Sequence, residues 1–307
     1  MDETLTNTLN GLTIEVPISH GHLHVFPLLA GAFAKEENFL LLDDGIQNGT
    51  LRVEELNEGG SVPELRVINE GSLPVLILEG DELTGARQNR VVNSSVLVAA
   101  YSELVLPVSC VERGRWSYRS RAFSPSAGSP HLALRRLKTR SVHDSLKRGR
   151  GHRSDQGAVW REVDRKFRLH EAASPTRALQ DSRSHLSGKL DAFEKLAEEF
   201  PEGSCGVVVA LGGRPVLLEV LAGPRSFARV SRKLLSGYAF EAVGAGERGG
   251  APEASAVGRF ILAVATAGHQ EYRAVGPGRD LRFEAEGISG YALIGEKGVL
   301  HAAAFAG

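Results

Sequence analysis

The hydrophobic pattern of this chain changes its period part-way along, at a segment rich in serine, proline and glycine (residues 124–130). Before that segment, from residue 12 to about residue 110, short aliphatic and β-branched runs alternate with turn residues, as in a β-sandwich or barrel. After it, between residues 132 and 167, apolar residues recur at helical spacing. The order of strands, then helices, then mixed elements favours an α+β fold over a doubly wound parallel sheet.

We therefore expect a β-rich, sandwich-like or barrel-like part at residues 1–123 and a helical, then mixed part at residues 124–307, joined in one integrated unit. Strands in the first part are predicted at residues 22–28, 73–78 and 104–108, with turns at 43–45 and 58–60. In the second part we expect helices at 132–146, 158–167, 174–200, 227–243 and 254–265, a hairpin of 205–211 with 215–221, and strands at 272–275, 281–286, 291–294 and 299–305.

Composition excludes several classes of protein. No run approaches the roughly 18–20 apolar residues that a membrane helix needs. The acidic, polar start of the chain lacks the basic and apolar regions of a secretion signal. The two cysteines, Cys110 and Cys205, are too few for a disulfide scaffold and too far apart for a zinc knuckle. A reducing cytoplasm is therefore the expected location.

The charges are unevenly distributed, although the net charge is only -1. Residues 1–112 hold 17 acidic and 5 basic side chains, whereas residues 113–190 hold 6 acidic and 19 basic ones. The basic segment either faces an anionic ligand such as nucleic acid, or is solvated and packs against the acidic first third of the chain. The sequence leaves both interpretations open.

Polar and charged residues gather at the ends of apolar strands between residues 78 and 116. The group comprises Glu79, Asp81, Glu82, Arg87, Gln88, Asn89, Arg90, Glu112, Arg113, Arg115 and Trp116. Its carboxylates are suitable ligands for Mg²⁺ or another divalent cation, and neighbouring carboxylates suit acid–base chemistry. Its arginines suit phosphate, with Trp116 available to stack on a base. The alternative is an exposed acidic turn that the arginines neutralise.

Four further features have both a functional and a structural interpretation. Gln156 and Trp160 share a helix face and are predicted to approach the arginines, unless Trp160 is a core anchor. His20, His22 and His24 alternate, so on one strand they would share a face able to chelate zinc, although exposed histidines are commoner. Cys110 is either a nucleophile or a buried thiol. The Gly-x-Gly-x-x-Gly pattern at residues 244–249 follows a predicted helix, so we interpret it as a loop.

Three motifs resemble those of a known family. They are Glu79-Gly80-Asp81-Glu82 with Gly85 and Gln88-Asn89-Arg90, then Val108-Ser109-Cys110-Val111-Glu112 with Arg115-Trp116, and Asp155-Gln156 with Trp160. The chain is similar in these motifs, and over nearly its whole length, to the ADP-ribosylglycohydrolase- and rhodanese-phosphatase-associated domain family. The name records genomic neighbours and fusion partners. It implies processing of ADP-ribose or NAD-linked nucleotides.

The resemblance leads us to expect binding or processing of an ADP-ribose-like nucleotide, with hydrolysis or transfer as the reaction class of an enzyme. Arg87, Arg90 and Arg115 are predicted to hold the pyrophosphate, and Gln88, Asn89, Trp116 and Gln156 to contact the rest of the ligand. Asp81, Glu82 and Glu112 are the candidate catalytic residues, and Glu79, Asp81 and Glu82 the candidate Mg²⁺ ligands. The alternative is a non-catalytic module that binds nucleic acid or an acidic protein through residues 113–190.

Overall fold

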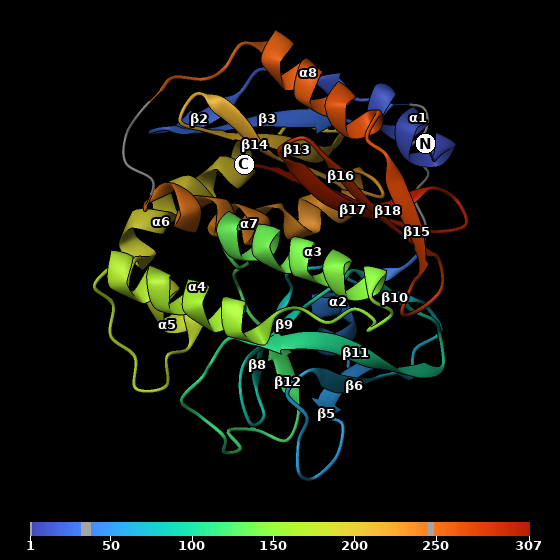
Figure 1. The fold of residues 1–307 in the computed structure, drawn as a ribbon, viewed down its shortest axis with the longest axis vertical. Helices are drawn as coiled ribbons and strands as arrows, with labels where there is room; N and C mark the ends of the chain where they lie inside the picture. The colour runs from blue at the N-terminus through green and yellow to red at the C-terminus, as the bar shows by residue number, and fades with distance from the viewer. Residues whose placement is uncertain (1, 32–37, 245–248) are drawn as a thin grey trace. The chain divides into compact units, whose positions relative to one another are not determined.

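A computed structural model describes residues 2–31, 38–244 and 249–307 of the chain (Figure 1). The chain forms two compact units. Unit 1 comprises residues 1–37, 188–273 and 278–307, and unit 2 comprises residues 38–187 and 274–277. The boundary that we expected after residue 123 falls inside unit 2. The glycine-rich pattern at 244–249 lies largely outside the described residues.

Unit 1 is built on a nine-stranded antiparallel sheet, in the order β1-β3-β13-β14-β18-β17-β16-β15, with β2 also paired to β3. Its strands are β1 (Thr13–Ile14), β2 (Ile18–His20), β3 (Leu23–Leu29), β13 (Ser204–Leu211), β14 (Arg214–Leu221), β15 (His269–Arg273), β16 (Arg279–Ala285), β17 (Ile288–Ile294) and β18 (Val299–Ala306). Its helices are α1 (Glu3–Asn10), α6 (Ser187–Glu194), η1 (Lys195–Glu199), α7 (Pro224–Ala242) and α8 (Ala254–Ala265). The N-terminal strands thus pair with C-terminal ones.

Helices cover both faces of this sheet, which explains why β13 is buried along its whole length. Apolar residues of α1 and α8 form one core cluster with alternate residues of β3, β13, β14 and the C-terminal strands. The predicted hairpin turn is present, since Gly212 and Gly213 both have positive φ, 60° and 79°, as a type I′ turn requires. Helix α7 begins at Pro224, which suits the first position of a helix.

The predicted row of three histidines on one strand is wrong. The chain turns at Gly21, which has a φ of 58°, so the histidines lie on a hairpin. His20 packs against the ring of Phe193, His22 Nε2 lies 2.8 Å from the carbonyl oxygen of Ala242, and His24 Nδ1 lies 2.8 Å from the hydroxyl of Ser19. Each histidine therefore has its own structural contact.

Unit 2 contains a six-stranded antiparallel sheet in the order β12-β8-β9-β11-β6-β5, and a small sheet in the order β10-β7-β4. The strands are β4 (Leu40–Leu41), β5 (Leu51–Glu55), β6 (Glu64–Asn69), β7 (Val75–Ile77), β8 (Glu82–Gly85), β9 (Arg90–Val92), β10 (Val96–Val98), β11 (Ser102–Cys110) and β12 (Phe123–Pro125). A bridge between Glu54 and Ala122 joins the two ends of the larger sheet, which becomes a nearly closed barrel. The inward-facing apolar residues of its strands form one core cluster.

The helices of unit 2 are α2 (Leu42–Gln47), α3 (Leu132–Lys147), α4 (Gln156–Leu169) and α5 (Leu179–Ser184). Helix α2 replaces the turn predicted at residues 43–45, because Leu42 and Ile46 pack against the barrel core and Asp44 accepts a hydrogen bond from the amide of Leu41. The helix predicted from residue 174 is also wrong at its start. Ser174 Oγ accepts the amides of Thr176 and Ala178 in a non-helical turn.

The α+β class predicted from the sequence is confirmed, with a nearly closed, barrel-like sheet in the N-terminal half followed by helices and mixed elements. In the described ranges, no helix is long and apolar enough to cross a membrane.

Candidate functional site at the mouth of the barrel

Most of the predicted site residues meet at one end of the barrel of unit 2, which we call the barrel mouth. Strands β5, β8 and β11 end there, and β6, β9 and β12 begin there. The barrel mouth consists of these strand ends and the connecting loops, residues 56–63, 86–89 and 111–122. Loops 56–63 and 86–89 each join two neighbouring antiparallel strands, β5 to β6 and β8 to β9, whereas loop 111–122 crosses this end of the barrel from β11 to β12.

The innermost layer of the barrel mouth is polar. Along β5, the inward-facing residues Leu51 and Val53 are followed by Glu55, because alternate residues of a strand share a face. By the same alternation, Arg90 faces inward with Val92 on β9, and Cys110 faces inward with Val108 on β11. Arg90 and Cys110 are also direct partners across the two strands. The exposed fractions of Glu55, Arg90 and Cys110 are only 8%, 0% and 0%.

The Arg90 guanidinium is only partly hydrogen-bonded. Its Nη1 donates to the backbone and side-chain oxygens of Gln88 at 3.0 and 3.2 Å. Its Nη2 lies 4.0 Å from Glu55 Oε1, beyond hydrogen-bond distance. Neither Nε nor Nη2 has a hydrogen-bond acceptor among the residues that the structure describes. Burial lowers the pKa of Arg90, opposed by the nearby Cys110 and Glu55. A buried cation with unused donors is costly to keep, so this group is a candidate for ligand binding.

Aromatic rings and a second arginine lie at the outer rim. The Arg87 guanidinium carbon is 5.6 Å from the ring centre of Trp116 and 4.4 Å from that of Tyr118. The Arg90 guanidinium carbon is 5.8 Å from the Trp116 ring centre. Arg87 Nη2 donates to the carbonyl oxygen of Glu58 at 2.5 Å, while its Nε has no acceptor within the described part of the chain. The two rings are 44% and 51% exposed, so they are accessible for stacking.

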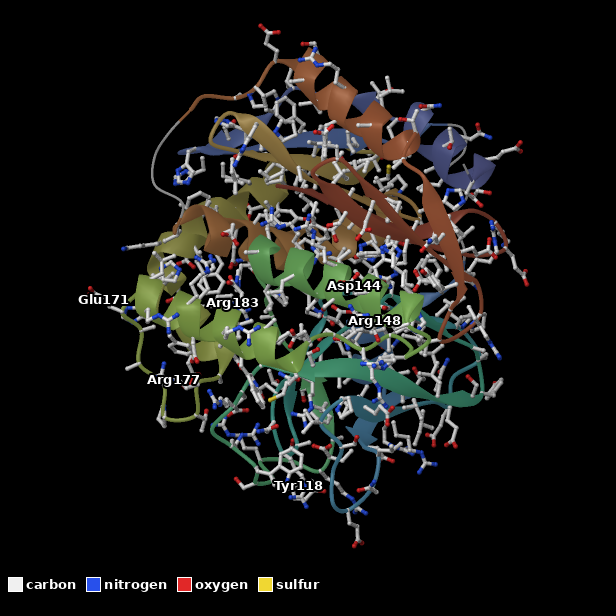
Figure 2. The ribbon with its side chains drawn as sticks, in the orientation of Figure 1. Tyr118, Asp144, Arg148, Glu171, Arg177 and Arg183 are labelled. Atoms are coloured by element: carbon white, nitrogen blue, oxygen red, sulfur yellow. The ribbon has the colours of Figure 1, made fainter. Side chains whose placement is uncertain are left out.

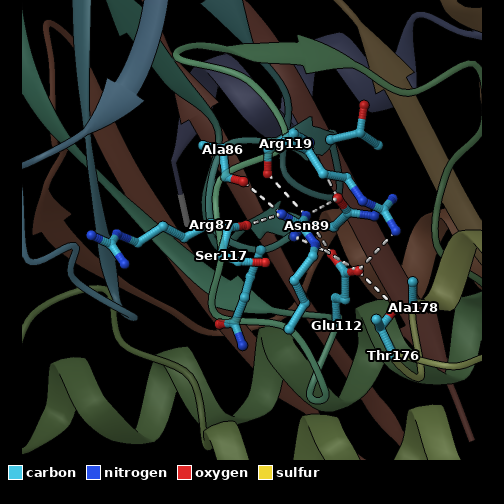
Figure 3. A network of polar contacts seen from close by, with 12 residues as sticks. Ala86, Arg87, Asn89, Glu112, Ser117, Arg119, Thr176 and Ala178 are labelled. Atoms are coloured by element: carbon cyan, nitrogen blue, oxygen red, sulfur yellow. Dashed lines mark hydrogen bonds and ion pairs between the residues drawn. The ribbon is translucent and has the colours of Figure 1, made fainter.

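A buried ion pair holds the loops of the barrel mouth in place (Figure 3). Arg115 makes a bidentate pair with Glu112, from Nε at 2.9 Å and from Nη2 at 2.6 Å. Its remaining donors reach the side chain of Asn89 and the carbonyl oxygens of Ala86 and Ser117. All its donors thus have acceptors within the protein. Arg115 and Asn89, which we predicted to bind the ligand, are thus part of the network that fixes the positions of the loops.

Glu112 is equally well bonded. In addition to Arg115, its carboxylate accepts the Asn89 amide at 3.0 Å and the Thr176 hydroxyl at 2.7 Å. Burial alone would raise the pKa of Glu112, but the hydrogen bonds from Arg115, Thr176 and the Asn89 amide outweigh it and lower the pKa. Glu112, predicted to be catalytic, is therefore an ionised carboxylate that anchors the barrel mouth.

Gln156 and Cys110 also make specific contacts. The Gln156 side chain pairs with the backbone of Cys110, with both hydrogen bonds 2.8 Å long, and so continues the sheet beyond β11. The prediction that Gln156 approaches this region is consistent with that contact. The Cys110 thiol lies 3.1 Å from Gln88 Oε1. Burial raises the pKa of Cys110, against the opposing effect of Arg90, which favours the thiol over the thiolate.

The three carboxylates predicted as metal ligands do not join the arginines of the barrel mouth. Glu79 binds Arg135 and Lys138 at 2.9 and 3.0 Å, and these two charges outweigh burial to lower the pKa of Glu79. Asp81 Oδ2 accepts the amide of Leu78, which closes a turn. Throughout the described ranges, no group of three histidine, cysteine or acidic side chains is placed to hold a metal ion.

Glu82 illustrates why the predicted cluster divides. Its neighbour Leu83 faces into the barrel, opposite Arg90 in the strand register, so the Glu82 side chain lies on the outer face. There it accepts a hydrogen bond from Arg183 Nη2 at 2.8 Å. Arg183 in turn donates to Ser126 and Ser129.

The family model for the ARG and Rhodanese-Phosphatase-superfamily-associated Protein domain matches residues 11–305. The chain belongs to this family. No curated protein and no solved structure matches the chain significantly. The match includes both units. The first two of the motifs that resemble this family, at residues 79–90 and 108–116, lie in β8, β9 and β11 and in the loops of the barrel mouth.

Sequence reasoning missed two residues of the site in this domain, Glu55 and Tyr118. Glu55 follows Leu51 and Val53 in an alternating strand, so the pattern indicated that its carboxylate would face the core. Nothing in the sequence placed β5 next to β12, however, and only barrel closure brings Glu55 to the arginines. Tyr118 lies in a loop without periodicity, and its position against Arg87 depends on the Arg115 network.

Proposed function

We propose that the barrel mouth binds the phosphate part of a nucleotide derivative of the ADP-ribose type. The observation that carries this proposal is the set of three buried guanidinium nitrogens, Arg87 Nε and Arg90 Nε and Nη2, that have no acceptor among the described residues. Phosphate oxygens are the matching acceptors, because arginine donors pair with them strongly. A phosphate would also offset the positive charge that burial makes costly.

The rim supports the nucleotide part of the proposal. Trp116 and Tyr118 are exposed rings beside Arg87, and a base that stacks on one of them would place its phosphates near the guanidinium groups. The family's name, which associates it with ARG and the rhodanese-phosphatase superfamily, is compatible with phosphate chemistry. Hydrolysis or transfer of the bound nucleotide, and a requirement for Mg²⁺, are parts of the proposal that the same experiment tests.

Calorimetric titration with ADP-ribose, with and without Mg²⁺, tests the proposal. We expect Arg87→Ala to weaken binding at least tenfold, about 1.4 kcal/mol, because it removes a donor and the cation beside the rings. Arg66→Ala is the matched control, because Arg66 is a barrel arginine paired with Glu103 on the outer surface. Product analysis of the same mixtures reports any turnover. Absence of heat in both conditions, or equal binding by Arg87→Ala, would refute the proposal.

A second candidate is nucleic-acid binding by the helical pair α3 and α4. Arg140, Arg148 and Arg150 are exposed, and in the described residues their side chains make no ion pair or hydrogen bond. Figure 2 shows Arg148, which follows the last residue of α3, beside Asp144 of that helix. An open groove of about 490 Å³ is lined by Ser141, Asp144, Ser145, Arg148, Arg150, Arg153, Ser154 and Asp155. Arginine and serine are the usual donors to a phosphodiester backbone.

Fluorescence anisotropy with a labelled 20-nucleotide strand tests this candidate. We expect Arg140→Ala/Arg148→Ala/Arg150→Ala to lose most of the binding and to flatten its salt dependence, because each lost phosphate contact lowers the logarithmic slope by roughly 0.7. Arg214→Ala/Arg259→Ala/Arg273→Ala, at exposed positions of unit 1, is the charge-matched control. Equal competition by polyglutamate of the same charge would instead indicate an acidic protein partner.

A further inference from the structure

We infer that the ligand of the barrel mouth carries a sugar hydroxyl near its phosphate, and that Glu55 is the residue that recognises this hydroxyl. The inference rests on the proposed function. Its starting point is Glu55 Oε2, a buried carboxylate oxygen with no hydrogen-bond donor among the described residues. The Glu55 side chain is only 4% exposed. A buried carboxyl group with one oxygen unused is costly, as is a buried guanidinium with unused donors.

Glu55 and Arg90 face each other across the barrel. In the order β12-β8-β9-β11-β6-β5, strands β9 and β5 are three positions apart, which in a closed six-stranded barrel places them on opposite walls. Both side chains point inward at the last layer before the loops. They approach to 4.0 Å between Arg90 Nη2 and Glu55 Oε1 without forming a hydrogen bond. The unused acceptor and the unused donors therefore belong to two side chains that approach each other from opposite walls of the barrel.

The other oxygen of Glu55 keeps the carboxylate in place. Glu55 Oε1 accepts the backbone amide of Arg87 at 3.2 Å, in the loop between β8 and β9. The chain enters that loop through Gly85 and Ala86, which both have positive φ, 114° and 37°. The Ala86 amide donates to Ser120 Oγ at 2.9 Å. Glu55 Oε2 thus has a fixed position beside the Arg87 backbone.

These positions define the ligand's chemistry. A simple phosphate supplies only acceptors, and Glu55 would repel it. A ligand with both phosphate oxygens and a hydroxyl satisfies both sets of groups, because the hydroxyl donates to Glu55 while the phosphate accepts from Arg90 and Arg87. In a nucleotide, the ribose hydroxyls lie close to the phosphate, whereas a base amine would lie with the base at Trp116 and Tyr118. Because Glu55 and Arg90 form the innermost layer of the barrel mouth, this hydroxyl lies on the side of the phosphates away from the base. The ligand class is therefore a nucleoside diphosphate that carries a further ribose, with free hydroxyls, beyond its phosphates.

The test compares ADP-ribose, ADP and inorganic phosphate by calorimetry on the full chain. ADP keeps the adenosine and both phosphates of ADP-ribose but lacks the distal ribose and its hydroxyls. We expect wild type to prefer ADP-ribose to ADP, and Glu55→Gln to reduce that preference at least fivefold. Because the substitution also removes a negative charge, Glu55→Gln should bind inorganic phosphate at least threefold more tightly than wild type. Glu55→Asp, which keeps the charge, should not gain phosphate affinity.

Glu54→Gln is the matched control, because Glu54 is the adjacent residue of β5 and lies on the outer face of the barrel, 4.0 Å from Arg66. It should leave all three affinities unchanged. Thermal unfolding confirms that each variant is folded. If wild type binds none of the three ligands, the proposed function itself fails. If wild type binds nucleotides but Glu55→Gln keeps both the ADP-ribose preference and the phosphate affinity, the role of Glu55 is overturned and the proposed function stands.

Discussion

Two buried arginines of unit 2 show how differently the same side chain can be used. Arg115 has an acceptor for every donor, including both carboxylate oxygens of Glu112, and so it joins the loops 86–89 and 111–122. Arg90 is more deeply buried and has two nitrogens without acceptors in the described residues. An arginine whose donors are all bonded within the protein stabilises the fold, whereas one with unused donors can still bond to a ligand. This contrast separates a loop anchor in the second motif from the residue that we propose for ligand binding in the first.

A third ion pair of unit 2 predicts how stability depends on pH. Glu162 on α4 lies 2.7 Å from His131 Nε2 and accepts two hydrogen bonds from Arg165. Burial alone would raise its pKa, but these partners lower it from 4.5 to about 2. Because the folded-state pKa is depressed, its stabilising contribution is present above pH 4.5 and disappears as the pH falls towards 2.

We therefore expect Glu162→Gln to lower the free energy of unfolding at pH 7 by about 1–2 kcal/mol, a value reduced for the partial exposure of the group. Urea unfolding followed by circular dichroism, at several pH values from 7 to 2, measures the difference from wild type. That difference should shrink below pH 4.5. A difference that stays constant down to pH 2 would show that the lost stability is steric and not electrostatic.

At the scale of elements, local signals predicted most of the fold. The hairpin of β13 and β14, helix α3 and helix α8 lie where periodicity and turn glycines placed them. The predictions that failed concern elements whose ends depend on residues far away in the sequence. The helix expected from residue 174 begins only at Leu179, because Ala178 forms a β-bridge with Glu112, 66 residues earlier. No local pattern encodes such a bridge, and a proline after a serine mimics a helix start.

Sequence patterns predicted only part of the candidate site, because some of its residues are also brought together by partners that are distant in the sequence. The gathering of Arg87, Gln88 and Arg90 with Trp116 follows from two motifs on paired strands, β9 and β11. The acidic residues do not join this group, because alternate residues of a strand point to opposite faces of the sheet. Glu82 and Arg90 lie on opposite faces of the β8–β9 pair, although they are close in sequence. Glu55 was missed because its position depends on closure of the whole barrel.

At the scale of the whole molecule, the chain forms unit 1 from segments that flank unit 2 in sequence. Unit 2 is nearly continuous, since only residues 274–277 come from elsewhere. Its barrel core is built from residues 42–123, with Val275 packed against it as a minor contributor. Unit 1, by contrast, needs β3 from the beginning of the chain to pair with β13.

This arrangement predicts different behaviour for two fragments. Residues 38–187 expressed alone should show cooperative thermal unfolding and a mixed α and β circular-dichroism spectrum, because their core is nearly complete. Residues 188–307 should aggregate or remain unfolded, because without β3 the edge of β13 is unpaired. Cooperative folding of the second fragment, or its absence in the first, would contradict this expectation.

The pairing of β3 with β13 also sets a delay during protein synthesis. The Cys205 thiol contacts the carbonyl oxygen of Leu28, a residue made 177 positions earlier. At about 5–20 residues per second, the ribosome takes on the order of 10–35 s to supply that partner. For that time β3 can pair only with β1 and β2, and the edge that β13 will occupy stays open, while the barrel can already close. The nascent chain of this protein therefore exposes an apolar strand edge until translation has passed residue 211.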